Sequence, residues 1–105
     1  MSGHVDSACK ISQLKKHGEN YLLEVLLPEN LRLFVASKGS VTLDGISLTV
    51  AEKLSSSFTV AIIPHTWNNT NLRQKSAGDY LHLEVDLISR YLVNAIHEGG
   101  YNGKY

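Results

Sequence analysis

The sequence predicts an all-β domain in which six short strands close into a small barrel. Six segments rich in alternating or β-branched apolar residues recur along the chain, and clusters of turn residues separate them. The length of 105 residues suits one domain with one core, and 43% apolar with 19% charged residues is typical of a globular protein. The formal net charge is zero, so the composition does not indicate a surface for nucleic acid.

The first strand is expected over residues 5–12, where Cys9 and Ile11 alternate with polar or small residues. The polar stretch at residues 15–20 contains a glycine and is expected to turn the chain. Residues 21–27 are nearly all apolar, which predicts a second strand that is covered on both faces or lies centrally in the sheet.

A short helical turn is expected next, between residues 28 and 35. Pro28 ends the preceding strand and suits the first position of a helix, where its missing N–H is no loss. Glu29 lies near the positive end of the helix dipole, which stabilises a carboxylate.

The clearest local signal is the hairpin Lys38-Gly-Ser-Val-Thr-Leu-Asp-Gly-Ile-Ser-Leu-Thr-Val50. Its Asp44-Gly45 pair is typical of a two-residue type I′ turn, in which both central residues have positive φ. If the apolar residues face a core, the hydroxyl side chains face the opposite way. The apolar set is Val41, Leu43, Ile46, Leu48 and Val50, and the hydroxyl set is Ser40, Thr42, Ser47 and Thr49.

Two further strands and three connections are expected after the hairpin. The strands are rich in β-branched, aromatic or alternating apolar residues, and the connections are polar. In order, they are a serine-rich turn (53–57), a strand (58–63), a helix-compatible segment (64–70), a polar connection (72–78) and a last strand (80–85).

An amphipathic helix is expected at residues 87–98, after a barrel that occupies residues 1–86. Apolar residues recur in it at three- and four-residue spacing, Asp86 is a suitable N-cap, and two glycines end the pattern. Residues 99–105 are expected to form a loose tail. The apolar stripe consists of Leu87, Ile88, Tyr91, Leu92, Ala95 and Ile96.

The five histidines do not stand at paired metal-ligand spacing with one another or with Cys9, so no metal site is expected. His4 and His65 lie at strand ends beside small or hydroxylic residues, which makes them candidates for a functional role. Cys9 is expected to pack as a small buried residue, and a single cysteine permits no internal disulfide. No nucleophile elbow or phosphate-binding glycine loop is present. At this point both an enzyme and a binding module stay open.

Six motifs along the chain resemble those of riboflavin synthase, in the same order and at the same spacing. The resemblance covers roughly residues 2–93 and is specific because the motifs occur together. It is to the second, C-terminal barrel of that family, since the opening and the cysteine-bearing hairpin of the first barrel are absent. The motifs are Gly3-His-Val-Asp6, the hairpin above, Ile63-Pro-His-Thr66, Thr70-Asn-Leu72, Gly78-Asp79 and Leu83-Glu-Val-Asp86.

The resemblance implies a six-stranded Greek-key β-barrel with short helical turns and a C-terminal α-helix. In this family two molecules of 6,7-dimethyl-8-ribityllumazine dismutate to riboflavin and 5-amino-6-ribitylamino-uracil, without a metal or added cofactor. The chain then corresponds to half of the enzyme, either as an excised domain or as a single-barrel relative. The implied partners are lumazine or riboflavin, the N-terminal barrel of a neighbouring subunit, and further copies in a homotrimer.

The resemblance assigns catalytic roles to His4, Asp44 and Ser47. A base such as His4 is suited to move the acidic proton of the lumazine C7 methyl near pH 7. Asp44 and Ser47 match the polar positions at the reacting faces, and much of the rate is expected from holding two flat substrates together. The implied lumazine contacts are Gly3, His4, Val5, Lys38, Ser47, Leu48, Thr49, Ile63, Pro64, His65, Thr66, Trp67 and Asn68, with His65 acting only through its backbone and Trp67 either covering the ligand or packing locally.

A lone barrel is expected to supply one substrate site, so the resemblance implies weak binding of lumazine or riboflavin and little turnover. The alternative is a non-catalytic lumazine- or flavin-binding module of the lumazine-protein type. A structural barrel without a ligand is a third reading. A cytoplasmic location is expected, because the single cysteine fits a reducing compartment and the sequence shows no secretory signal or membrane-length apolar run.

Overall fold

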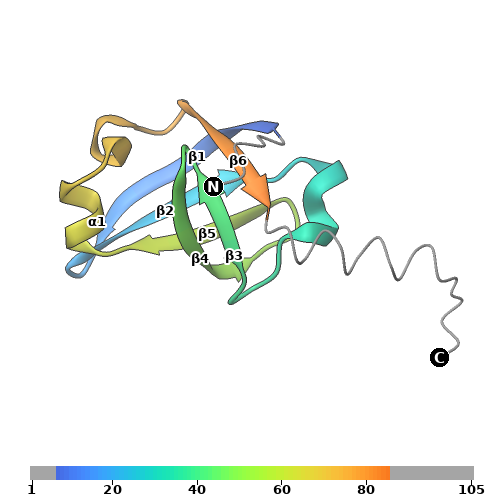
Figure 1. The fold of residues 1–105 in the computed structure, drawn as a ribbon, viewed down its shortest axis with the longest axis horizontal. Helices are drawn as coiled ribbons and strands as arrows, with labels where there is room; N and C mark the ends of the chain where they lie inside the picture. Colours follow the sequence, from blue (N-terminus) through green and yellow to red (C-terminus); the bar gives the residue numbers. More distant parts are fainter. Residues whose placement is uncertain (1–6, 86–105) are drawn as a thin grey trace, which may run out of the picture.

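The computed structural model describes residues 7–85, which form a closed antiparallel barrel of six strands (Figure 1). The predicted all-β barrel is therefore confirmed. The helix predicted at residues 87–98 and the tail predicted at 99–105, like the site residues Gly3, His4 and Val5, lie outside the described residues. The strands are β1 Ser7–His17, β2 Asn20–Leu26, β3 Ser40–Leu43, β4 Ile46–Lys53, β5 Ser57–Ile62 and β6 Tyr80–Val85.

The connectivity of the strands is that of a Greek key. Around the barrel the order is β1-β2-β5-β4-β3-β6, so the consecutive strands β3, β4 and β5 are also neighbours in space. Long connections bring β2 beside β5 and β6 beside β3. β2 and β6 each form a four-stranded Greek key with β3, β4 and β5.

The core is built from the inward residues of alternate strand positions. In β5, Phe58, Val60 and Ile62 are all fully buried, and burial of each such side chain contributes about 1.5–3 kcal/mol. Cys9 joins this core as predicted, and burial raises the pKa of its thiol above the ordinary value. The buried apolar set is completed by Ile11, Leu23, Val25, Leu27, Leu31, Val35, Val41, Leu43, Val50, Leu72, Leu81, Leu83 and Val85.

The connection between β1 and β2 is much tighter than the sequence suggested. The turn predicted within residues 15–20 is confirmed, but it occupies only Gly18 and Glu19, because β1 continues to His17 and pairs with β2 as far as His17↔Asn20. Only two residues separate the strands, and Gly18 adopts a φ of 66° there. Ladder hydrogen bonds use backbone groups, so polar side chains do not stop a strand that protrudes into solvent.

Of the two alternatives expected for β2, the structure confirms the central position, because β2 pairs with β1 on one side and β5 on the other, but the strand is not covered on both faces. Leu23 and Val25 are buried, whereas Leu26 is 41% exposed. The strand faces the barrel interior on one side only, since a small closed barrel has a single filled interior.

Three short helical turns connect the strands. The 3₁₀ turn η1 (Glu29–Phe34) and the helix α1 (Pro64–Asn68) confirm the two expected helical segments. A further 3₁₀ turn, η2 (Asn71–Gln74), overlaps the predicted polar connection, and its Leu72 is buried in the core. That anchor holds the α1–η2 loop on the barrel.

The hairpin of β3 and β4 has the geometry that its sequence predicts. Asp44 and Gly45 have φ values of 50° and 83°, and the flanking pair is Leu43↔Ile46. Val41, Leu43 and Val50 are buried, whereas the hydroxyl residues of β4 are exposed. The alternation of the sequence is therefore the alternation of core and surface.

Replacing Gly45 tests the backbone requirement of this turn. We expect Gly45→Ala to lower the free energy of unfolding by about 1 kcal/mol or more, because L-residues are disfavoured by roughly 1–2 kcal/mol in this region. An added Cβ meets nothing within 4 Å, so the loss measures the backbone alone. Gly45→Asn is the matched variant, and its loss should be smaller because asparagine tolerates positive φ. Equal losses in urea-unfolding experiments would contradict this explanation.

Candidate functional site

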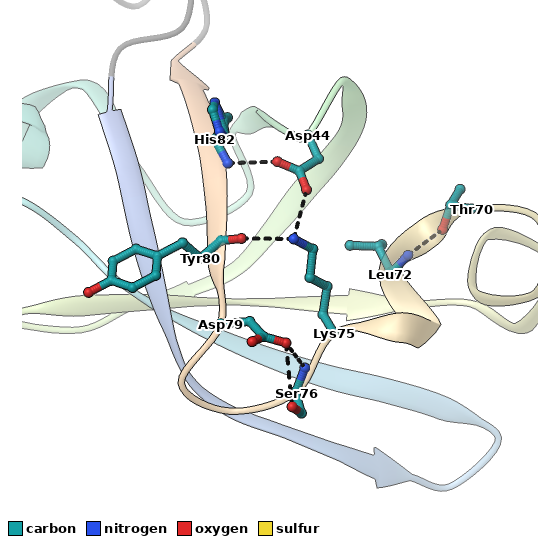
Figure 2. Close-up of polar contacts among 8 residues, drawn as sticks. All are labelled: Asp44, Thr70, Leu72, Lys75, Ser76, Asp79, Tyr80 and His82. Carbon is teal, nitrogen blue, oxygen red and sulfur yellow. Dashed lines mark hydrogen bonds and ion pairs between the residues drawn. The ribbon is translucent and has the colours of Figure 1, made fainter.

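Asp44 lies at the tip of the hairpin and is tied to β6 (Figure 2). Its Oδ1 accepts the backbone N–H of His82 at 2.7 Å, and its own N–H donates to the His82 carbonyl at 2.9 Å. Its Oδ2 lies 3.6 Å from Nζ of Lys75. The residue therefore has a structural function in addition to any role toward a ligand.

Ser47, Leu48 and Thr49 follow the turn on β4 and divide between its two faces. Ser47 and Thr49 are exposed, while Leu48 is half-buried and packs against the core. The pairs Thr42↔Ser47 and Thr42↔Glu84 place Ser47 in a polar row that crosses β4, β3 and β6 on the outside of the barrel. These hydroxyls can both donate and accept hydrogen bonds.

Residues 47–49 lie at the same end of the barrel wall as the segment that leaves β5. The ladder between β4 and β5 runs from Val50↔Val60 to Lys53↔Phe58, so residues 46–49 extend past its end. β5 ends at Ile62 and passes directly into α1. Two segments predicted to contact lumazine, residues 47–49 of β4 and residues 63–68 after β5, therefore lie at the same end of neighbouring strands.

Lys38 lies at the other end of the hairpin. Its φ is 72°, its backbone N–H donates to the Val50 carbonyl at 2.8 Å, and it is exposed. The tip at Asp44 and the base at Lys38 are thus separated by the length of β3.

The segment from Ile63 to Asn68 forms one exposed turn of helix. Pro64 occupies its first turn, and Ile63 is 53% exposed even though it is large and apolar. Thr66 is half-buried, and its carbonyl accepts the Thr70 hydroxyl at 2.8 Å. The His65 carbonyl accepts the side-chain amide of Asn69 at 2.7 Å. These backbone contacts hold the loop in one conformation.

Trp67 packs locally on Tyr21 of β2. The two rings are stacked with their centroids 3.7 Å apart and their planes at 11°, and Nζ of Lys16 lies 5.1 Å from the Tyr21 ring centre. The stack borders a hollow of about 390 Å³ between the β1–β2 turn and α1. Its lining residues are Lys16, Gly18, Glu19, Tyr21, Pro64, Trp67 and Asn68.

Two other hollows meet at Asp44. The smaller has a volume of about 280 Å³ and joins the hairpin tip to the α1–η2 loop. The larger, of about 500 Å³, lies between the tip, η2 and the start of β6, and Asn71 lines both. Asp44 and Trp67 therefore line different hollows. The smaller hollow is lined by Asp44, Ile46, Asn69, Thr70, Asn71 and Leu72.

Sequence reasoning did not include the residues of the α1–η2 loop in the site. Thr70 and Asn71 stood within a recognised motif, so the signal was present, but only the order of the motifs was used. Lys75 had no such signal, because nothing local marks the partner of a lysine. Among residues 7–85 no group of three or more histidine, cysteine or acidic side chains could hold a metal ion. No helix in that range is long and apolar enough to span a membrane.

The geometry can be compared with known proteins. A sequence profile described as the lumazine binding domain matches residues 2–86, which is nearly the whole barrel. The chain belongs to the lumazine-binding domain family. A lumazine-binding domain is thus the unit that β1 to β6 form.

The curated relatives of this lumazine-binding domain include riboflavin synthases from several bacteria. The protein of Bacillus amyloliquefaciens is 35% identical over 98 residues, which are 93% of this chain and 46% of that protein. The protein of Brucella abortus is 39% identical over 89 residues, 85% of this chain and 44% of that protein. The chain therefore spans about half the length of the curated relatives it matches.

Solved structures show the same fold. A structure of LumP complexed with 6,7-dimethyl-8-(1'-D-ribityl) lumazine matches with a TM-score of 0.78 at 14% identity, over 82% of this chain and 49% of LumP. A complex of LumP with riboflavin matches with a TM-score of 0.77 at the same identity, over 82% of this chain and 47% of LumP. At this identity the comparison establishes the barrel architecture of the domain.

The ring stack can be tested through the intrinsic fluorescence of the chain, because Trp67 is its single tryptophan. We expect Tyr21→Leu to shift the tryptophan emission to longer wavelength, since the indole loses its stacking partner and gains water contact. Stability should fall by about 1 kcal/mol. Tyr80→Leu is the control, because Tyr80 is 55% exposed and lines a different hollow. An unchanged emission maximum in Tyr21→Leu would show that the stack does not persist in solution.

Proposed function

We propose that this chain is one half of a riboflavin synthase, equivalent to its C-terminal lumazine-binding barrel. The observation that carries the proposal is the match of nearly the whole chain to about half of several riboflavin synthases. The family profile over residues 2–86 supports the same ligand class. In the complete enzyme, two molecules of 6,7-dimethyl-8-ribityllumazine yield riboflavin and 5-amino-6-ribitylamino-uracil.

In this proposal the ligand lies outside the barrel wall at the end of β4. Ser47 and Thr49 offer exposed hydroxyls there, and the turn from Ile63 to the half-buried Thr66 brings backbone groups and one more hydroxyl to the edge of the pteridine. Ile63 supplies an exposed apolar surface for a flat ring. Lys38, at the base of the hairpin, is assigned to the ribityl chain or a ring oxygen.

The proton transfer is assigned to His4, whose neutral form is available near pH 7. The C7 methyl of lumazine is acidic because its carbanion delocalises into the ring, so a base of this strength can move the proton. The second lumazine takes a nucleophile at C7, and the Ser47 hydroxyl is suited to hold that adduct or its water. Asp44 supplies a fixed negative charge at the hairpin tip.

A single barrel holds one of the two substrates. The reaction needs a second lumazine face to face with the first, and most of the catalytic advantage lies in that alignment. We therefore assign to this chain alone weak binding of lumazine or riboflavin and little turnover. In the full enzyme an N-terminal barrel of a neighbouring subunit, within a homotrimer, supplies the second site.

The second candidate function is a non-catalytic lumazine- or flavin-binding module. The observation that favours it is the similarity of the fold to LumP, whose structures hold lumazine and riboflavin. The two functions share one ligand class and differ in turnover. A barrel without any ligand is the remaining alternative.

Binding and turnover of the purified chain distinguish these functions. Titration with 6,7-dimethyl-8-ribityllumazine and with riboflavin should quench the emission of Trp67, which lies one residue from the proposed contact at Thr66. Riboflavin formation from lumazine should be roughly a hundredfold or more below that of a complete riboflavin synthase, because the second substrate is not aligned. Addition of an isolated N-terminal barrel should raise the rate if the chain is half of the enzyme. No change of fluorescence at high ligand concentration would contradict both ligand-binding functions.

The exposed hydroxyl of Ser47 provides the sharpest residue-level test. We expect Ser47→Ala to weaken lumazine binding by about three- to tenfold, the equivalent of one lost hydrogen bond. Ser55→Ala is the matched control, since Ser55 is exposed in the turn between β4 and β5, away from the proposed contacts. Equal dissociation constants for Ser47→Ala and the unmodified chain would remove Ser47 from the site.

A further inference from the structure

The two oxygens of the Asp44 carboxylate have different partners. Oδ1 accepts the His82 backbone N–H, which extends the β3–β6 pairing one position beyond Leu43↔Leu83. Oδ2 points to Nζ of Lys75 at 3.6 Å (Figure 2). The torsion that exchanges two carboxylate oxygens is broad, so a partner on each oxygen is what keeps one orientation.

Lys75 is itself held in place from both ends. Its backbone N–H donates to the Leu72 carbonyl at 3.0 Å, where η2 ends, and Leu72 is anchored in the core. Its Nζ donates to the Tyr80 carbonyl at 3.0 Å. The ammonium is thus fixed between β6 and the hairpin tip rather than moving freely in solvent. Because the side chains of Lys75 and Asp44 are only 29% and 25% exposed, water screens their attraction less than at an open surface.

The other carboxylate of this region is engaged elsewhere. Asp79 lines the same hollow as Lys75, but its Oδ2 accepts the Ser76 backbone N–H at 2.9 Å and lies 3.4 Å from the Ser76 hydroxyl. These contacts close its own turn before β6. Lys75 therefore directs its charge to Asp44.

This pair lies where it can influence a ligand. Asp44 lines both the smaller hollow beside Ile46 and Thr70 and the larger hollow beside Lys75. Ile46 and Leu48 lie on the same face of β4, so the smaller hollow adjoins the proposed ligand contact at Leu48. A rotation of the Asp44 carboxylate that turns both oxygens away from their partners would release the His82 amide.

We propose that Lys75 is a positioning residue for Asp44, which fixes the orientation of the carboxylate for the polar part of a bound lumazine. The inference rests on the proposed function, because it gives the Asp44 carboxylate a ligand to act on. Lys75 does not touch the ligand in this proposal and acts only through Asp44.

The binding test is a double-mutant cycle in the intact 105-residue chain, with 6,7-dimethyl-8-ribityllumazine as the probe. Lys75→Met removes the ammonium but keeps a long side chain, and should weaken binding about tenfold. Lys75→Arg should restore most of the affinity, because it returns a cation to the same position. In an Asp44→Asn background, which keeps an oxygen acceptor for His82, Lys75→Met should have no further effect. Lys15→Met, at an exposed position of β1, is the control and should bind normally.

A second measurement needs no ligand and separates this inference from the proposed function. Hydrogen exchange of the His82 amide reports the contact with Asp44, and Lys75→Met should lower its protection several-fold relative to the Val60 amide of β5. If the unmodified chain binds neither lumazine nor riboflavin, the proposed function fails, and the exchange result alone decides whether Lys75 orients Asp44. Unchanged His82 protection overturns the inference. It is also overturned if Lys75→Met binds within twofold of the unmodified chain, or if its effect persists in the Asp44→Asn background.

Discussion

Closure of this barrel depends on the short ladder between β3 and β6. Within residues 7–85, three residue pairs join these strands, from Val41↔Val85 to Leu43↔Leu83, and the Asp44 side chain extends the ladder by accepting the His82 amide N–H. A barrel without this seam would expose two strand edges with unpaired backbone groups. The buried Leu43, Leu83 and Val41 behind the seam can pack only if the two strands meet. The hairpin turn is therefore a local structure and also part of the contact between β3 and β6 that closes the barrel.

The pairing of β3 with β6 also determines which side chains form the surface that we assign to the ligand. Closing β3 onto β6 fixes which face of the hairpin is inside, and this leaves Ser47 and Thr49 outside the wall. The register between β4 and β5 then leaves residues 46–49 beyond the ladder, next to the chain that enters α1. The connection between α1 and η2 is held there because Leu72 is buried in the core and Lys75 forms an ion pair with Asp44 at the hairpin tip. Asp44 thus combines structural contacts with the role that we propose for it toward the ligand, which is why its charge and its geometry are difficult to separate by a single substitution.

The chain spans about half the length of the riboflavin synthases it matches, and the proposed chemistry depends on this. The reaction joins two identical molecules, so an enzyme built from two related barrels can hold one in each. In the proposed function, a lumazine-binding domain of this kind provides one of the two substrate sites. Its affinity there depends on few contacts, because the hollows described above open to the surface and are not enclosed cavities.

Features that depend on neighbouring residues could be predicted from the sequence. Alternation in β3 and β4, the positive φ of Asp44 and Gly45, the helical turns after Pro28 and Ile63, and the burial of Cys9 are all local consequences of residue type and spacing. The recognised motifs also led to the lumazine-binding domain family. The roles of the individual site residues, and the positions of Gly3, His4 and Val5, stay predictions.

Features that depend on contacts between residues far apart in the chain became visible only in the folded barrel. The polar end of β1 is a strand because its backbone pairs with β2, and β2 has one exposed face because the barrel has a single interior. Trp67 of α1 stacks on Tyr21 of β2, and Lys75 forms an ion pair with Asp44 at the hairpin tip. Asp44 and His82 are 38 residues apart, and no local pattern encodes such a contact. It arises because closing the sheet brings both residues to the same seam, where a carboxylate oxygen can replace a backbone carbonyl as the acceptor.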